Sequence, residues 1–116
     1  MALSVEAVNF DCGDPALVGR FWAAALSREL RADDDGIYFL EAGDTGAEIV
    51  FVSVPEGKTV KNRVHLDLRP DDQAAEVERL LSLGARRVDI GQTGEESWVV
   101  LADPEGNEFC VLRSRK

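Results

Sequence analysis

The sequence is poor in the residues that most often bind metals. Its 116 residues include one histidine, two cysteines and one methionine. Metal sites usually need three or four donors at compatible positions, and the chain has no His-x-x-x-His, Cys-x-x-Cys or Glu-x-x-His motif. The acidic run 33–35 lacks the spacing of a calcium loop, so a solvated turn is the better interpretation. Local motifs therefore predict no metal cofactor.

Basic residues are also scarce, with 13 Lys and Arg against 22 Asp and Glu and a net charge of −9. A protein that follows a nucleic-acid backbone needs a basic stripe to displace its counterions. Attraction to an anionic membrane surface needs basic residues for the same reason. The charge balance therefore argues against a nucleic-acid or membrane partner.

Long apolar runs and a disulfide framework are absent as well. No run approaches the roughly 18 apolar residues of a membrane span, and residues 2–10 lack the positive start of a signal peptide. Cys12 and Cys110 are expected to be reduced thiols, although their separation in the sequence does not exclude a disulfide between them. Together these features predict a cytoplasmic protein.

What is present is a duplicated pattern of strands and helices. The first half predicts strands at 4–12, 37–42 and 48–54, a weak strand before the turn at 31–36, and a helix that Asp14 caps and that ends near Ser27. The second half predicts strands at 62–68, 86–90, 97–102 and 108–113, and a helix between Asp71 or Asp72 and Gly84. Both halves are βαβββ modules, which predicts an α+β fold. One such module cannot bury its own helix and sheet face, so two should pair, within the chain or across a dimer.

A few side chains are candidates for chemistry. His65 lies on the predicted polar face of its strand, and Asp67 lies two residues later. His65 is either an ordinary strand residue or a base or ligand. Cys110 has apolar neighbours, which favours a buried structural thiol over a nucleophile activated by His65. Trp22 lies on the apolar stripe of its helix. Trp98 could line a pocket or fill the interior.

The ending LADPEGNEFCVL at Leu101–Leu112, the Asp14-Pro15 helix start with Phe21-Trp22 after it, and the duplication closely resemble the vicinal-oxygen-chelate superfamily. The chain is similar to its glyoxalase-like and bleomycin-resistance-like members over about residues 5–112. The resemblance implies a single domain, 1–116, whose modules 1–57 and 61–116 form a curved, incompletely closed mixed sheet around a cavity. Members include lyases, epimerases, dioxygenases and drug-binding resistance proteins.

The resemblance also implies where metal ligands would lie. His65 matches the second-module histidine, and Cys110 takes the place of a glutamate, with Glu108 one pleat away. In the first module the matching positions are Ala7 or, if VNFD is aligned with VHLD, Asn9, together with Val50 and Glu48. Because only His65 is a typical ligand, no cofactor is predicted. The alternative is an altered divalent metal site of Asn9, Glu48, His65 and Cys110 or Glu108.

From this resemblance we expect a small-molecule-binding protein, with an acidic cavity suited to a cationic or polar ligand. The expected lining residues are Asn9, Asp11, His65, Asp67, Trp98 and Cys110. The alternative is a lyase or isomerase acting on a small carbonyl compound, with His65 as catalytic acid or base or as part of the altered metal site. A third interpretation is an assembly element, and a homodimer is expected because the sheet edges are open.

Overall fold

The computed structural model describes residues 3–43, 46–89 and 96–115. The chain divides into two compact units, Met1–Gly57 and Lys58–Lys116. Within these described ranges, each unit contains one helix and one four-stranded mixed sheet, so the fold is α+β with two βαβββ modules, as predicted. No helix in the described part of the chain is both long enough and apolar enough to span a bilayer.

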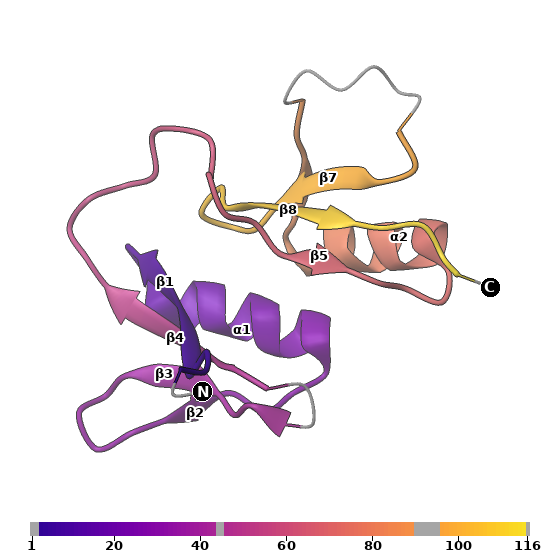
Figure 1. The fold of residues 1–116 in the computed structure, drawn as a ribbon. Coiled ribbons are helices and arrows are strands. Elements are labelled where there is room, and N and C mark those ends of the chain that lie inside the picture. The colour runs from indigo at the N-terminus through magenta and orange to yellow at the C-terminus, as the bar shows by residue number, and fades with distance from the viewer. Residues whose placement is uncertain (1–2, 44–45, 90–95, 116) are drawn as a thin grey trace. The chain divides into compact units, whose positions relative to one another are not determined.

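The first unit forms its sheet in the order β1-β4-β3-β2 (Figure 1). β1 runs parallel to β4, while β3 is antiparallel to both of its neighbours. Its elements are β1 (Ala7–Cys12), α1 (Pro15–Leu26), β2 (Arg31–Ala32), β3 (Tyr38–Leu40) and β4 (Glu48–Ser53). The predicted turn at 31–36 is therefore shorter than expected, because its first two residues form β2.

Helix α1 begins and ends where local signals predict. The Asp14 side chain accepts a hydrogen bond from the Leu17 amide, Pro15 takes the first helical position, and Ser27 ends the helix in the left-handed conformation with φ of 55°. Trp22 is fully buried, which confirms its place in the core. It contacts the Phe10 ring of β1 at a centroid distance of 5.5 Å, so the helix packs on the apolar face of the sheet.

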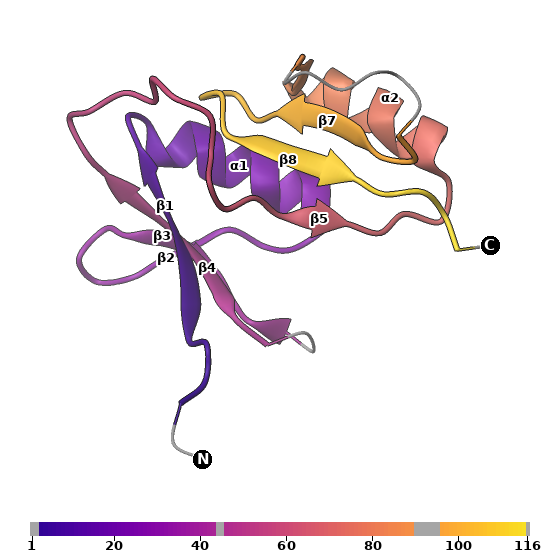
Figure 2. The ribbon, with the colours of Figure 1, turned by 45° about the horizontal axis from the view of Figure 1, so that its top comes forward.

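The second unit repeats this topology with the order β5-β8-β7-β6. Figure 2 shows β8 between β5 and β7. Again the first strand, β5, runs parallel to the last, β8. The elements are β5 (Asp67–Leu68), α2 (Gln73–Leu83), β6 (Arg86–Arg87), β7 (Val99–Ala102) and β8 (Glu108–Val111). Asp72 caps α2 and Gly84 ends it, both as predicted. The expected strand end at residue 90 lies outside the described residues.

The predicted strand at 62–68 is wrong over most of its length. Only Asp67 and Leu68 form β5, and Val64, expected on a buried face, is 81% exposed. Glu108 explains the difference, because its carboxylate accepts the Asn62 amide at 2.8 Å and its carbonyl accepts the Asn62 side chain at 3.2 Å. These side-chain hydrogen bonds hold this part of the chain in place of a strand ladder.

The DPEGN turn between β7 and β8 is built on a buried carboxylate. Asp103 is fully buried, and its Oδ1 accepts hydrogen bonds from the backbone amides of Glu105 and Asn107. The Asn107 side chain also donates to Asp103, and Gly106 has a positive φ of 93°. The turn therefore depends on Asp103 and on a glycine that tolerates the left-handed region.

The same turn occurs in the first unit, where it is exposed. Asp33 Oδ1 accepts from the amides of Asp35 and Ile37, and Gly36 has a φ of 81°. The acidic run is thus a turn, as predicted. It joins β2 to β3, whereas the DPEGN turn joins the last two strands of its module, so the two turns are not at equivalent positions.

Replacing Asp103 with alanine should lower the free energy of unfolding by about 2–3 kcal/mol, since the part-buried amides of Glu105 and Asn107 lose their acceptor. Asp33→Ala is the matched control and should cost about 1 kcal/mol or less, because water can reach the exposed amides. Urea unfolding of both variants at neutral pH measures the difference. Equal losses would contradict this account of the DPEGN turn.

Candidate functional site

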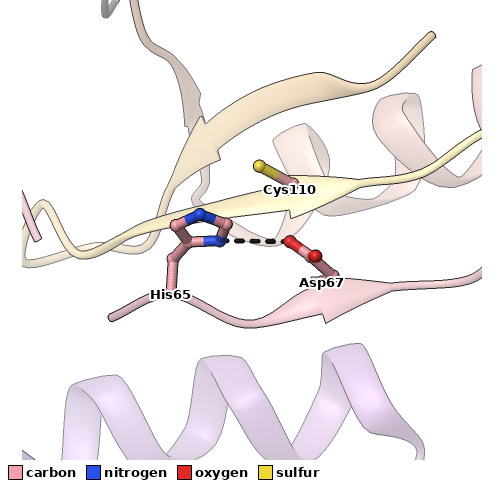
Figure 3. A group of neighbouring side chains, drawn as sticks. All are labelled: His65, Asp67 and Cys110. Atoms are coloured by element: carbon pink, nitrogen blue, oxygen red, sulfur yellow. Dashed lines mark ion pairs between the residues drawn. The ribbon is translucent and has the colours of Figure 1, made fainter. Parts of the chain in front are cut away.

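Three candidate side chains come together in the second unit, namely His65, Asp67 and Cys110 (Figure 3). Their potential ligand atoms all lie within 4.8 Å of one another. His65 Nδ1 lies 3.1 Å from Asp67 Oδ1, and these two side chains are 39% and 51% exposed. A molecule in solution can therefore reach the imidazole and the carboxylate.

The pairing of β5 with β8 brings this cluster together. Asp67 lies opposite Cys110 in the parallel register, and the Cys110 amide donates to the Leu66 carbonyl at 2.9 Å. Residues opposite one another share a face of the sheet, whereas Phe109 and Val111 alternate to the other face. Both of these apolar residues are fully buried, so the sheet has one apolar face and one face that carries the cluster.

Cys110 is a buried thiol, as predicted, and it is not in a disulfide. Burial raises the pKa of the Cys110 thiol, and the negative charge and hydrogen bond of Asp67 raise it further against the opposing charge of Lys61. The thiol therefore keeps its proton at neutral pH. This disfavours Cys110 as a nucleophile, because the thiolate is the reactive form.

Asp67 gives His65 a defined orientation. A carboxylate beside one imidazole nitrogen favours a proton on that nitrogen and fixes the ring. Because Nδ1 faces Asp67, Nε2 is the nitrogen left for a ligand or for proton transfer. The pair has the arrangement that general acid–base chemistry uses, with His65 as the acting group and Asp67 as its support.

Glu108 lies one pleat from Cys110 but has other partners. Its side chain is 12% exposed, and one oxygen lies 3.1 Å from Lys58 Nζ while the other accepts the Asn62 amide. Burial by itself would raise the pKa of Glu108, but the hydrogen bond from Asn62 and the Lys58 ammonium outweigh it and hold the pKa below its usual value. Glu108 is thus an ionised structural carboxylate, outside the cluster of three.

The other three expected lining residues are not members of this cluster of three. Asn9 and Asp11 are exposed on β1 of the first unit, opposite Val50 and Val52. Trp98 directly precedes β7 and is 43% exposed, so it does not fill the interior. That these three residues contact a ligand stays a prediction.

The two modules can now be aligned by structure. Asp14 and Asp72 are equivalent helix caps, and Asn9 pairs with Val50 as Asp67 pairs with Cys110. His65 therefore corresponds to Ala7, because each lies seven residues before its helix cap. The alternative alignment of VNFD with VHLD, which would match His65 with Asn9, is two residues out of this register. The first module has Ala7, Asn9 and Val50 where the second has His65, Asp67 and Cys110.

Sequence reasoning missed Lys58, Asn62 and Lys61. Lys58 and Asn62 hold Glu108, which is 50 and 46 residues away along the chain, so no local pattern could pair them. Lys61 is close enough to affect the Cys110 thiol. Its proximity likewise follows from the tertiary fold alone.

The chain matches a known protein family in sequence and several solved structures in fold. Residues 7–112 match the family model described as "Glyoxalase-like domain". No curated protein matches the chain.

Among solved structures, the antibiotic-binding protein TnmS3 from Streptomyces sp. CB03234 is 22% identical with a TM-score of 0.70, over 97% of this chain and 98% of that one. The bleomycin resistance determinant encoded on transposon Tn5 is 20% identical with a TM-score of 0.63, over 98% and 100%. A glyoxalase-related enzyme from Fulvimarina pelagi is 16% identical with a TM-score of 0.68, over 95% and 87%. These structures share the fold of the chain.

The raised pKa of Cys110 makes a pH-dependent prediction. Alkylation of Cys110 by iodoacetamide should follow an apparent pKa above that of a free cysteine, because burial disfavours the thiolate and the negative charge of Asp67 repels it. Asp67→Asn removes the negative charge, so it should lower this pKa and speed alkylation several-fold at pH 8. Peptide mass spectrometry separates Cys110 from Cys12. An unchanged pH profile in the variant would show that Asp67 does not act on the thiol.

Proposed function

Because the chain belongs to the glyoxalase-like domain family, we propose that it binds a small molecule and that the second-unit cluster contacts this ligand. Two structures of the same fold support the ligand class, since one is titled an antibiotic-binding protein and the other a bleomycin resistance determinant. The observation that carries the proposal is the accessible His65–Asp67 pair, which lies beside the Cys110 thiol.

The chemistry of the cluster suits a polar ligand. Asp67 presents a carboxylate, His65 presents Nε2, and the protonated Cys110 thiol is a weak donor. Val100 lies opposite Cys110 on β7, so a buried apolar side chain lies beside the thiol on the same face. A few polar groups among apolar surface is the usual composition of a small-molecule site. Asn9, Asp11 and Trp98 are proposed as further ligand contacts.

The proposal can be tested on the single histidine. Isothermal titration with bleomycin and a panel of cationic and aromatic compounds should identify a ligand, whose Kd should rise at least tenfold in His65→Ala. Val64→Ala is the matched control, since Val64 is the exposed neighbour in the same segment and should leave the Kd unchanged. Equal binding by the two folded variants would remove His65 from the site.

A second candidate function is lyase or isomerase chemistry on a small carbonyl compound. The His65–Asp67 pair favours it, with His65 Nε2 as the base that removes a proton beside the carbonyl and Asp67 as its support. The cluster also fits a divalent ion, because one imidazole nitrogen, one carboxylate oxygen and one sulfur converge from a single module. An ion bound there would polarise a carbonyl oxygen.

Cobalt(II) tests the metal alternative directly. If the cluster binds the ion, the protein should show a thiolate-to-cobalt charge-transfer band that Cys110→Ser loses, while a folded Cys12→Ser variant keeps it. Metal binding must displace the Cys110 proton, so the band should weaken as pH falls. If the wild-type protein shows no such band in excess cobalt, the cluster does not bind the ion and only the metal-free function remains. The proposed homodimer and cytoplasmic location are separate expectations.

A further inference from the structure

His65 is not held by the strand ladder of its own sheet. β5 begins at Asp67, and the Leu66 carbonyl is bonded to the Cys110 amide. His65 precedes both residues. Its neighbour Val64 is 81% exposed, so burial of that side chain does not fix the segment. On the other side of His65, a contact at residue 62 limits where this backbone can lie.

That contact is the attachment of Asn62 to Glu108. The Asn62 amide donates to Glu108 Oε1 at 2.8 Å, and the Asn62 side chain donates to the Glu108 carbonyl at 3.2 Å. The second carboxylate oxygen, Oε2, accepts from Lys58 Nζ at 3.1 Å. The Glu108 side chain is only 12% exposed, so water competes weakly for these bonds.

The two attachments leave a short bridge. Asn62 is bonded to Glu108 and Leu66 is bonded to Cys110, so only residues 63–65 lie between fixed points. Glu108 and Cys110 are one pleat apart on β8, so the same strand that carries the cluster also holds both ends of the bridge. A three-residue bridge with both ends fixed has little conformational freedom.

From these contacts we propose that Glu108 is a positioning residue for His65: it holds Asn62 so that the imidazole meets Asp67. This role rests on the proposed function, because the reason to position His65 is that its Nε2 contacts the ligand. Glu108 itself touches neither the ligand nor His65. It acts through the backbone of residues 62–65.

The test uses the imidazole of the only histidine, which gives one unambiguous NMR signal set. In the ligand-free wild type at a pH where His65 is neutral, nitrogen-15 shifts should show the proton mainly on Nδ1, where Asp67 accepts it. Asp67→Ala provides the reference for a ring without this partner, because alanine has no acceptor for Nδ1. Glu108→Ala should move the shifts at least halfway to that reference.

Matched variants separate the attachment from general damage. Glu108→Gln keeps an oxygen for the Asn62 amide and should stay close to wild type. Lys58→Met should do the same, because it removes the ion pair and the Lys58 hydrogen bond to the Val60 carbonyl but leaves both Asn62 contacts. Asn62→Asp attacks the same contact from the other side, because its carboxylate cannot donate to the Glu108 carbonyl that the Asn62 side chain binds and is repelled by that oxygen. This variant should release His65 as Glu108→Ala does. It keeps the test decisive if Glu108→Ala fails to fold. Protection of the Cys110 amide from hydrogen exchange reports that β5 still pairs with β8.

A folded Glu108→Ala or Asn62→Asp variant with wild-type imidazole shifts would overturn the positioning role. With a ligand in hand, the Kd of a folded Glu108→Ala variant should rise at least fivefold. The NMR result needs no ligand, so it stands apart from the proposed function. A failure of every ligand to bind would count against that function alone, while unchanged shifts would count against the role of Glu108 alone.

Discussion

The parallel pairing of the first strand of each module with its last strand is the interaction on which the rest of the structure depends. In the first unit it runs through six residue pairs, from Ala7 opposite Glu48 to Cys12 opposite Ser53. This register gives the sheet an apolar face for the helix and leaves a second face for polar side chains. In the second unit the register places Asp67 opposite Cys110, and the cluster follows from it.

The second unit keeps this pairing with a much shorter strand. β5 has two residues where β1 has six, and hydrogen bonds from Asn62 to Glu108 take the place of the missing ladder. The segment before β5 is thereby exposed, and His65 lies in it beside Asp67. A regular strand would have fixed these residues by backbone bonds alone. The polar site and the short β5 thus both follow from the replacement of backbone ladder bonds by the hydrogen bonds between Asn62 and Glu108.

Much of the fold could be predicted because its signals are local. Asp14-Pro15, Asp72 and Gly84 mark the helix ends, and the DPEGN sequence specifies a turn that its own aspartate closes. The strand at 62–68 was predicted from alternation, which cannot show that Glu108 will bond Asn62 from 46 residues away. In the site, the resemblance marked His65 and Cys110, and spacing added Asp67. No local pattern indicated the partners of Glu108. The similar letters VNFD and VHLD suggest that Asn9 matches His65, but the helix caps and the strand register match Asn9 with Asp67.

The central feature of the site is that His65, Asp67 and Cys110 form one cluster in the second unit. Nuclear Overhauser effects in the wild-type protein measure this directly, since the ring protons of the single histidine can be assigned without ambiguity. Cross-peaks from the His65 ring to the β-protons of Asp67 and Cys110, with a slowly exchanging Cys110 amide, are the expected result. A ring that shows cross-peaks to neither residue while the Cys110 amide stays protected would contradict the account.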